Sequence, residues 1–339
     1  EYVAYNAALK DGRTLFGLIV EQSPETVTLV DAKNEKTVVE RSKIESLEPS
    51  AVSLMPEKLL DDMTNDQVRD LFAFLQSGGP PPGDGGANAG PMVTFQSRRA
   101  VRGTDQRLTW QPVTEARPID AHRTAIIICD MWDKHWSRGA SERVAEMAPR
   151  MNQVIQAARA AGVTVIHAPS ETMAFYADHP ARKRAVAAPH VPLPALKPHD
   201  DHPLPVDDSD GGSDTGEKPW FRAWTRQHPA IEIDPDRDFI ADDGQQIWNV
   251  LRQRSADLVL LMGVHTNMCC LNRGFAIKGL VRRGQAVALV RDLTDAMYNP
   301  ARPPYVSHDD GTRLVVEYVE KFWCPTVTGE ELKRALRPR

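Results

Sequence analysis

Hydrophobic residues in the last two-thirds of the chain form short continuous runs that alternate with helix-like patterns. The runs lack the polar and apolar alternation of half-exposed strands, which is typical of strands buried on both faces; they cover residues 124–129, 163–167, 257–264 and 286–290. Elsewhere, apolar positions recur every three or four residues and predict helices; the first is capped by Ser141, and the others cover 245–254, 268–283 and 312–322. This alternation predicts an α/β fold, with a parallel sheet covered by helices on both faces.

The first 76 residues have a different pattern. Strand-like segments separated by polar turns cover residues 5–10, 14–21, 26–30 and 36–40. Four or five short strands at this spacing predict a small barrel or a curled sheet. Thr64 and Gln67 then have the spacing of a capping box, and apolar residues from Val68 to Leu75 fall on one helical face. We therefore expect a small β-rich module that ends in one helix.

One sharp change in composition separates the two patterns. Residues 77–86 read Ser-Gly-Gly-Pro-Pro-Pro-Gly-Asp-Gly-Gly. Such a segment cannot bury a core, because Gly and Pro both resist regular structure. The sequence therefore predicts a β-rich module over residues 1–76, a linker over 77–92 and an α/β domain over 93–339.

Charge and composition narrow the classes of partner. The 339 residues include 41 Lys and Arg against 46 Asp and Glu, which leaves no excess of basic residues for binding a nucleic acid. No apolar run approaches the ~18 residues of a membrane span, so no membrane insertion is expected. The four cysteines form neither a zinc spacing nor a disulfide framework. We therefore expect the partner to be a small-molecule substrate.

Three candidate catalytic residues stand at or near the ends of predicted strands. Asp130 follows the first strand, Lys218 lies in a Lys-Pro-Trp-Phe segment, and Cys269 lies where a strand turns into a helix. A nearby cation favours a thiolate over a thiol, and a carboxylate can accept and return a proton. Together they make a plausible nucleophilic set. The alternative is that Cys269 is a small buried apolar residue.

Aromatic residues flank the proposed acid and lysine. Trp132 and His135 follow Asp130, and Trp220 and Phe221 follow Lys218. They are expected to bind the substrate in an aromatic pocket, the alternative being that they pack in the core or in a lid. The adjacent Cys270 is expected in the packing, because neighbouring helical residues point about 100° apart.

These segments together resemble the isochorismatase-like cysteine hydrolase family over about residues 120–325. The match includes Asp130, Lys218 with Pro219, and the Gly-Val-x-Thr-Asn-x-Cys sequence at 263–269. The resemblance implies a Rossmann-like three-layer α/β sandwich that hydrolyses an amide or ureido C–N bond through a thioester on Cys269. It also implies a cis peptide bond at Val264-His265, beside an oxyanion site, and assembly into a homo-oligomer.

The chain departs from the family pattern at two places. Trp132 replaces a Gln that is usual in the family, so the floor of the pocket is expected to differ. The Asp-x-His metal motif of nicotinamidase-like members is missing near His167, so neither a metal nor another cofactor is expected. Since isochorismatases that cleave a vinyl ether typically lack the cysteine, Cys269 favours an amidase-type reaction. The vinyl-ether hydrolase remains an alternative.

A loop over residues 192–216 is rich in Pro, Asp and His. Its ligand spacing matches no EF-hand or zinc site. We expect a solvated loop, with a lid or an oligomer contact as the functional alternatives.

The N-terminal module has a resemblance of its own. Met55-Pro56, followed by the predicted helix, resembles the end of c-type cytochrome domains found in planctomycete-type haem-binding proteins. The Cys-x-x-Cys-His motif is absent, so covalent haem attachment is not expected, and Met55 is interpreted as an ordinary core residue. The alternative function is a redox or scaffold protein that docks with a haem-bearing partner. The sequence does not fix the cellular compartment. The cytochrome-like tail favours an extracytoplasmic location, whereas the hydrolase-like domain favours the cytoplasm.

Overall fold

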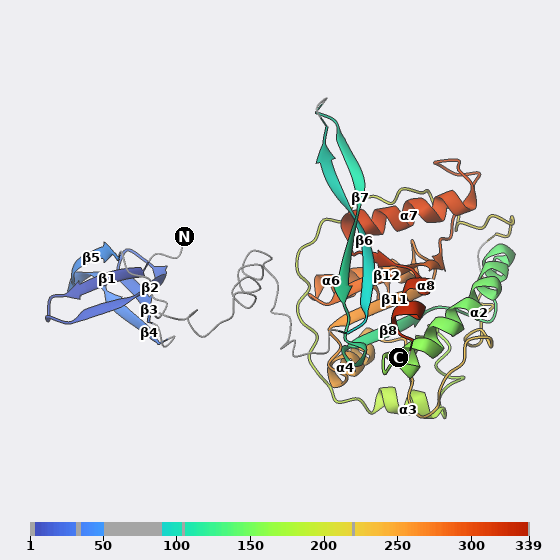
Figure 1. The fold of residues 1–339 in the computed structure, drawn as a ribbon, viewed down its shortest axis with the longest axis horizontal. Coiled ribbons are helices and arrows are strands. Elements are labelled where there is room, and N and C mark those ends of the chain that lie inside the picture. Colours follow the sequence, from blue (N-terminus) through green and yellow to red (C-terminus); the bar gives the residue numbers. More distant parts are fainter. Residues whose placement is uncertain (1–3, 32–34, 51–89, 104–105, 219–220, 338–339) are drawn as a thin grey trace. The chain divides into compact units, whose positions relative to one another are not determined.

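The computed structural model describes residues 4–31, 35–50, 90–103, 106–218 and 221–337 (Figure 1). The chain divides into two compact units, Glu1–Asp84 and Gly85–Arg339, and the boundary lies inside the predicted linker. The predicted helix over 64–75 and Met55 lie outside the described residues. Within those ranges, no helix is both long and apolar enough to cross a bilayer.

The N-terminal unit is a five-stranded antiparallel sheet in the order β4-β3-β2-β1-β5. Ala7, Val27 and Leu29 form its small core. The four predicted strands are present, and a fifth follows a 3₁₀ turn over Arg41–Lys43. The strands are β1 Ala4–Leu9, β2 Thr14–Gln22, β3 Thr26–Val30, β4 Lys36–Glu40 and β5 Ile44–Pro49.

The C-terminal unit contains an eight-stranded sheet in the order β10-β9-β8-β11-β12-β13-β6-β7. The first six of these strands run parallel, and the β6–β7 hairpin adds two antiparallel strands at one edge. The strands are β6 Met92–Arg102, β7 Leu108–Pro118, β8 Thr124–Cys129, β9 Thr164–Ala168, β10 Phe239–Ile240, β11 Leu258–Val264, β12 Ala286–Asp295 and β13 Thr326–Val327.

Helices cover both faces of this sheet (Figure 1). The fully buried strand β8 divides its side chains between the two faces: Ile127 packs with α4, α6 and α7, and Ile128 packs with α2 and α8. This is the predicted three-layer α/β sandwich. The helices are α2 Arg138–Ala160, α3 Pro180–Val186, α4 Gly244–Gln253, α5 Cys269–Asn272, α6 Ile277–Arg282, α7 His308–Phe322 and α8 Gly329–Ala335.

Several local predictions are wrong. The helix expected over 268–283 is split into α5 and α6, because Arg273 has an extended backbone with ψ of 149°. Ser137, not Ser141, caps α2 by accepting the Ala140 N–H. The Ser141 hydroxyl instead accepts the N–H of His135 at 2.9 Å. The β6–β7 hairpin was not predicted.

Candidate active site

The carboxyl ends of four parallel strands meet at one edge of the sheet. Asp130 follows β8, Ser170 lies two residues beyond β9, His265 follows β11, and Asp295 ends β12. A cavity of about 610 Å³, lined by Cys269, three tryptophans, two histidines and three carboxylates, opens at this edge. Its volume is in the range of small-molecule sites, and open α/β sheets bind ligands at this end of their strands.

Asp130 is fully buried at the end of β8. Its backbone has a φ of 47°, a left-handed conformation that is uncommon for a residue other than Gly. One carboxylate oxygen accepts the Ser170 N–H at 2.7 Å, and the other accepts Nε–H of Arg273 at 3.2 Å. Burial raises the pKa of Asp130, although Arg273 and Ser170 oppose that shift. A carboxylate with a raised pKa is a better proton acceptor.

Cys269 is the first residue of α5, and its half-buried side chain lines the cavity. Burial raises the pKa of its thiol, the charge of Asp130 raises it further, and the charge of Arg273 lowers it. The thiol and the Asp130 carboxyl are in side-chain contact, so a proton can pass between them. Cys270, in contrast, is fully buried in the core.

The cation next to these two groups is Arg273, which the sequence analysis did not single out. Arg273 follows α5, and its guanidinium lies between the buried Asp130 and the more exposed Glu171, at 3.2 and 3.9 Å. Its positive charge lowers the pKa of both Asp130 and Cys269. No motif marked it, because its place in the site depends on the break between α5 and α6.

The predicted lysine is not brought to this site. The Lys218 side chain is exposed, and it is absent from the cavity wall as well as from the ion pairs of the described residues. The preceding Glu217 turns toward the hydroxyls of Ser213 and Thr215, at 2.8 and 2.6 Å. These hydrogen bonds join Glu217 to residues of the same loop and not to the cavity. The structure therefore brings Asp130 and Cys269 together with Arg273 and does not bring Lys218 to them.

The turn between β11 and α5 provides main-chain donors. The Val264-His265 peptide bond is cis, at the position that the family resemblance gives it. The N–H groups of Met268 and Cys270 donate to the His265 carbonyl at 3.0 and 3.1 Å. Within the described ranges, no main-chain acceptor binds the N–H of His265 or Cys269, so both remain available.

Thr266 and Asn267 hold this turn against neighbouring segments. The Thr266 N–H donates to the Asp295 carbonyl at 2.8 Å. The Asn267 amide donates to the Asp208 carboxylate at 2.7 Å and to the Met297 carbonyl at 3.0 Å. The Thr-Asn pair of the sequence motif therefore has a structural reason: it ties the residues before Cys269 to β12 and to the 206–217 loop.

Two histidines in the cavity wall are neutral at physiological pH. Burial lowers the pKa of His265 to about 3 and that of His135 to about 4. Their rings meet edge to face with centroids 4.9 Å apart. His265 is 2% exposed, and its Nε2 has no partner among the described residues, which is unusual because a buried polar atom without a hydrogen bond is costly.

Tryptophans form the aromatic part of the wall. Trp132 and Trp224 stack with ring centroids 4.2 Å apart, and Trp136 also lines the cavity. Trp132 and His135 thus lie where the sequence analysis expected substrate-binding residues. Phe221 does not: it is 61% exposed and lies outside the wall of this cavity. Trp220 lies outside the described residues.

The loop over residues 206–217 forms another part of the wall, through Asp208 to Gly211. Four of its aspartates are tied to other segments of the unit. Their partners are Arg302 for Asp207 at 2.6 Å, Asn267 for Asp208 at 2.7 Å, Asn299 for Asp210 at 2.9 Å and Arg143 for Asp214 at 2.7 Å. This part of the predicted loop is therefore anchored over the site.

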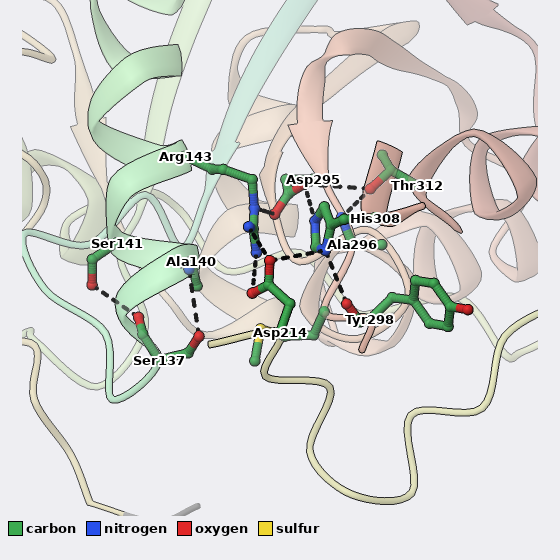
Figure 2. A network of polar contacts seen from close by, with 12 residues as sticks. Ser137, Ala140, Ser141, Arg143, Asp214, Asp295, Ala296, Tyr298, His308 and Thr312 are labelled. Carbon is green, nitrogen blue, oxygen red and sulfur yellow. Dashed lines mark hydrogen bonds and ion pairs between the residues drawn. The ribbon is translucent and has the colours of Figure 1, made fainter. Parts of the chain in front are cut away.

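Figure 2 shows one of these anchors, a network of charged and polar side chains around Asp214 and Asp295. Arg143 of α2 donates to Asp214 of the loop and, at 2.9 Å, to Asp295 of β12. His308 of α7 binds Asp295 through Nε2 at 2.8 Å and the Tyr298 carbonyl through Nδ1 at 2.9 Å. Because both ring nitrogens face acceptors, the ring must carry two protons to donate both bonds.

The structure describes no group of three or more His, Cys, Asp or Glu side chains placed to hold a metal ion. His167, near the position of the nicotinamidase-type motif, is fully buried. It bonds to Asp238 and Gln227, each at 3.0 Å.

One protein family and several solved structures are similar to this chain. The family described as the isochorismatase domain matches residues 124–302. Similar solved structures include a cysteine hydrolase from Pseudomonas syringae pv. phaseolicola 1448A, 21% identical, with a TM-score of 0.41, covering 65% of this chain and 94% of that chain. An isochorismatase family protein from Burkholderia thailandensis is 16% identical, with a TM-score of 0.37 and coverages of 63% and 96%. No curated protein matches the chain.

Proposed function

Because this chain belongs to the isochorismatase family of hydrolases, we propose that it is a cysteine hydrolase that cleaves a C–N bond of a small molecule. The bond belongs to an amide or a ureido group, and Cys269 carries the acyl group as a thioester. One observation supports this most directly: the Cys269 thiol, a buried carboxylate and a guanidinium meet at one cavity.

In the acylation step, the Cys269 thiol gives its proton to the Asp130 carboxylate and its sulfur attacks the substrate carbonyl carbon. The charge of Arg273 favours the thiolate at this moment, because it lowers the pKa of the thiol. The free N–H groups of His265 and Cys269 are the proposed donors to the oxyanion. The tetrahedral intermediate then collapses, the C–N bond breaks, and Asp130 protonates the leaving nitrogen.

In the second step, water attacks the thioester and gives a proton to the Asp130 carboxylate. Collapse of this intermediate breaks the C–S bond and releases the carboxylic acid. The departing sulfur takes the proton back from Asp130, which restores the starting state. The same carboxyl group thus serves as base and acid in both halves of the reaction.

Trapping of the acyl-enzyme tests this mechanism. We expect mass spectrometry of the wild type, quenched during turnover of a panel of small amides and ureides, to show an acyl adduct on the peptide that carries Cys269. Cys269→Ala and Asp130→Asn should lose the adduct and at least about 10³-fold in kcat/KM. Cys270→Ala is the matched control and should keep the adduct. An adduct on Cys270, or full activity of Cys269→Ala, would refute the proposal.

A further inference from the structure

The charges in the cavity wall are unbalanced. Glu171, Asp208 and Asp210 line the cavity, and Arg273 is the cationic side chain among its described lining residues. The guanidinium of Arg273 is already engaged by the buried Asp130 at 3.2 Å. The two histidines add no positive charge near pH 7, because burial holds their pKa values at about 3 and about 4.

The partners of these carboxylates are mostly neutral. Asp208 accepts a side-chain amide N–H from Asn267, and Asp210 accepts one from Asn299. Glu171 lies 3.9 Å from Arg273 and is 46% exposed. Hydrogen bonds from amides position a carboxylate but leave its charge in place, so this side of the cavity carries a negative potential.

The rest of the wall is suited to a cation with an apolar surface. Trp132, Trp136 and Trp224 contribute indole rings, and Met268 and Met297 contribute thioethers. The face of an indole attracts a cation electrostatically, and aromatic rings with nearby carboxylates bind alkylated ammonium groups better than neutral groups of the same shape. An anionic substrate would share the cavity with three carboxylates, which repel it.

Two buried polar atoms in the same wall lack a partner. The indole Nε1 of Trp224 and the imidazole Nε2 of His265 make no hydrogen bond among the described residues, although these residues are only 9% and 2% exposed. A buried donor or acceptor of this kind costs free energy until something binds it. Both residues line the cavity, where a ligand with polar atoms of its own supplies partners once the wall adjusts to it.

We propose that the cavity binds a substrate that carries an organic cation of the alkylammonium class, held between the tryptophans and the carboxylates of Glu171, Asp208 and Asp210. This inference rests on the proposed hydrolase function, since it names the substrate class of that site. The cation lies against the aromatic and acidic wall, and the scissile carbonyl faces Cys269.

The test compares choline with 3,3-dimethylbutan-1-ol, its neutral isostere, as ligands of the full chain. We measure how each slows the alkylation of Cys269 by iodoacetamide, with Cys269 identified by mass spectrometry, and how each changes the tryptophan fluorescence of Cys269→Ala. Choline should bind at least about 10-fold more tightly than the isostere. Both readouts report binding without turnover, so they stay informative even if the proposed hydrolysis fails.

Variants locate the effect in the cavity. Glu171→Gln should reduce the preference for choline about 2- to 5-fold, since it removes one partly exposed charge. Glu146→Gln removes an exposed charge on α2, outside the cavity wall, and should leave the preference unchanged. Equal binding of choline and the isostere, or no binding of choline, would overturn the proposal.

Discussion

At the scale of single residues, the site places two acids, Asp130 and Cys269, beside one cation, Arg273. Burial raises the pKa values of both Asp130 and Cys269. The charge of Asp130 raises the pKa of Cys269 further, whereas the hydrogen bond with Cys269 lowers the pKa of Asp130. Without a nearby cation, the thiol would hold its proton too firmly for a nucleophile. Arg273 supplies the compensating charge from 3.2 Å. The acid, the thiol and the cation therefore depend on one another for their protonation states.

Replacing Arg273 tests this dependence. In Arg273→Gln, the pKa of the Cys269 thiol should rise further, because the charge that lowers it is lost. Iodoacetamide should therefore alkylate Cys269 more slowly at pH 8, and kcat/KM should fall about 10²- to 10³-fold. Arg273→Lys, which keeps the charge, should recover part of both losses.

The matched control for that experiment is Lys218→Gln. Lys218 is exposed and outside the cavity wall, so its loss should change neither the alkylation rate nor kcat/KM by more than about 2-fold. A large loss of kcat/KM in Lys218→Gln, together with full activity of Arg273→Gln, would show that Lys218 is the catalytic cation.

At the scale of elements, the sequence predicts the central strands β8, β9, β11 and β12 and the helices α2, α4 and α7. Their hydrophobic patterns are uninterrupted, and Thr124–Cys129 was predicted to the residue. The short strands β10 and β13, the β6–β7 hairpin and the helices α3 and α8 carry weaker patterns and were not predicted. The site was harder to predict, because charge partners depend on distances that motifs do not encode. Asp130 and Cys269 lie at strand ends and could be found, whereas Arg273 required knowledge that the helix after Cys269 breaks at residue 273.

Residues 206–217 include the end of the loop over 192–216, for which the sequence predicts a solvated loop with a lid or an oligomer contact as the functional alternatives. Its composition suggested a solvated segment, but its four aspartates bind residues that are 59 to 95 positions away in the sequence. Hydrophobic periodicity carries no signal for such polar anchors. The loop therefore belongs to the wall of the site through side-chain bonds rather than through buried apolar area.

The network at His308 makes the stability of this region depend on pH. Burial lowers the pKa of His308, but the hydrogen bond and charge of Asp295 outweigh it, so the pKa is raised above 6.5. A raised pKa in the folded state gives stability that is present below the unfolded pKa and lost as the pH rises through the folded one. Wild-type protein should therefore lose a few degrees of Tm between pH 6 and pH 9.

The comparison variant is His308→Gln, in which this part of the pH dependence should disappear. His190→Gln removes an exposed histidine and should keep the wild-type slope. Differential scanning fluorimetry across the pH range measures all three proteins. Equal slopes for wild type and His308→Gln would show that the protonated ring does not stabilise the fold.

At the scale of the whole molecule, the two units have separate hydrophobic cores. The division between residues 84 and 85 falls in the Gly- and Pro-rich segment, which has little apolar surface to bury. The match to the isochorismatase domain covers residues 124–302 of the second unit. The Met55 segment, on which the haem resemblance of the first unit depends, lies outside the described residues.

Separate cores predict independent folding. A chain of residues 85–339 should keep the catalytic activity of the full chain within about 2-fold, and its Tm should match one of the transitions of the full chain. Calorimetry of both chains measures this. A shortened chain that is soluble and folded but inactive would show that the first unit contributes to catalysis.

Arg273 lies four residues after Cys269, directly at the end of α5, and this position has a consequence for how such a site can change over time. Where a nucleophile and its countercharge come from distant loops, any shift between those loops changes the pKa of the nucleophile. Here the thiol and the guanidinium belong to one short peptide segment. Other loops of the cavity wall can therefore change in length or sequence while the distance between these two groups is kept. Substitutions in those loops can then alter which substrate binds without altering the nucleophile and its countercharge.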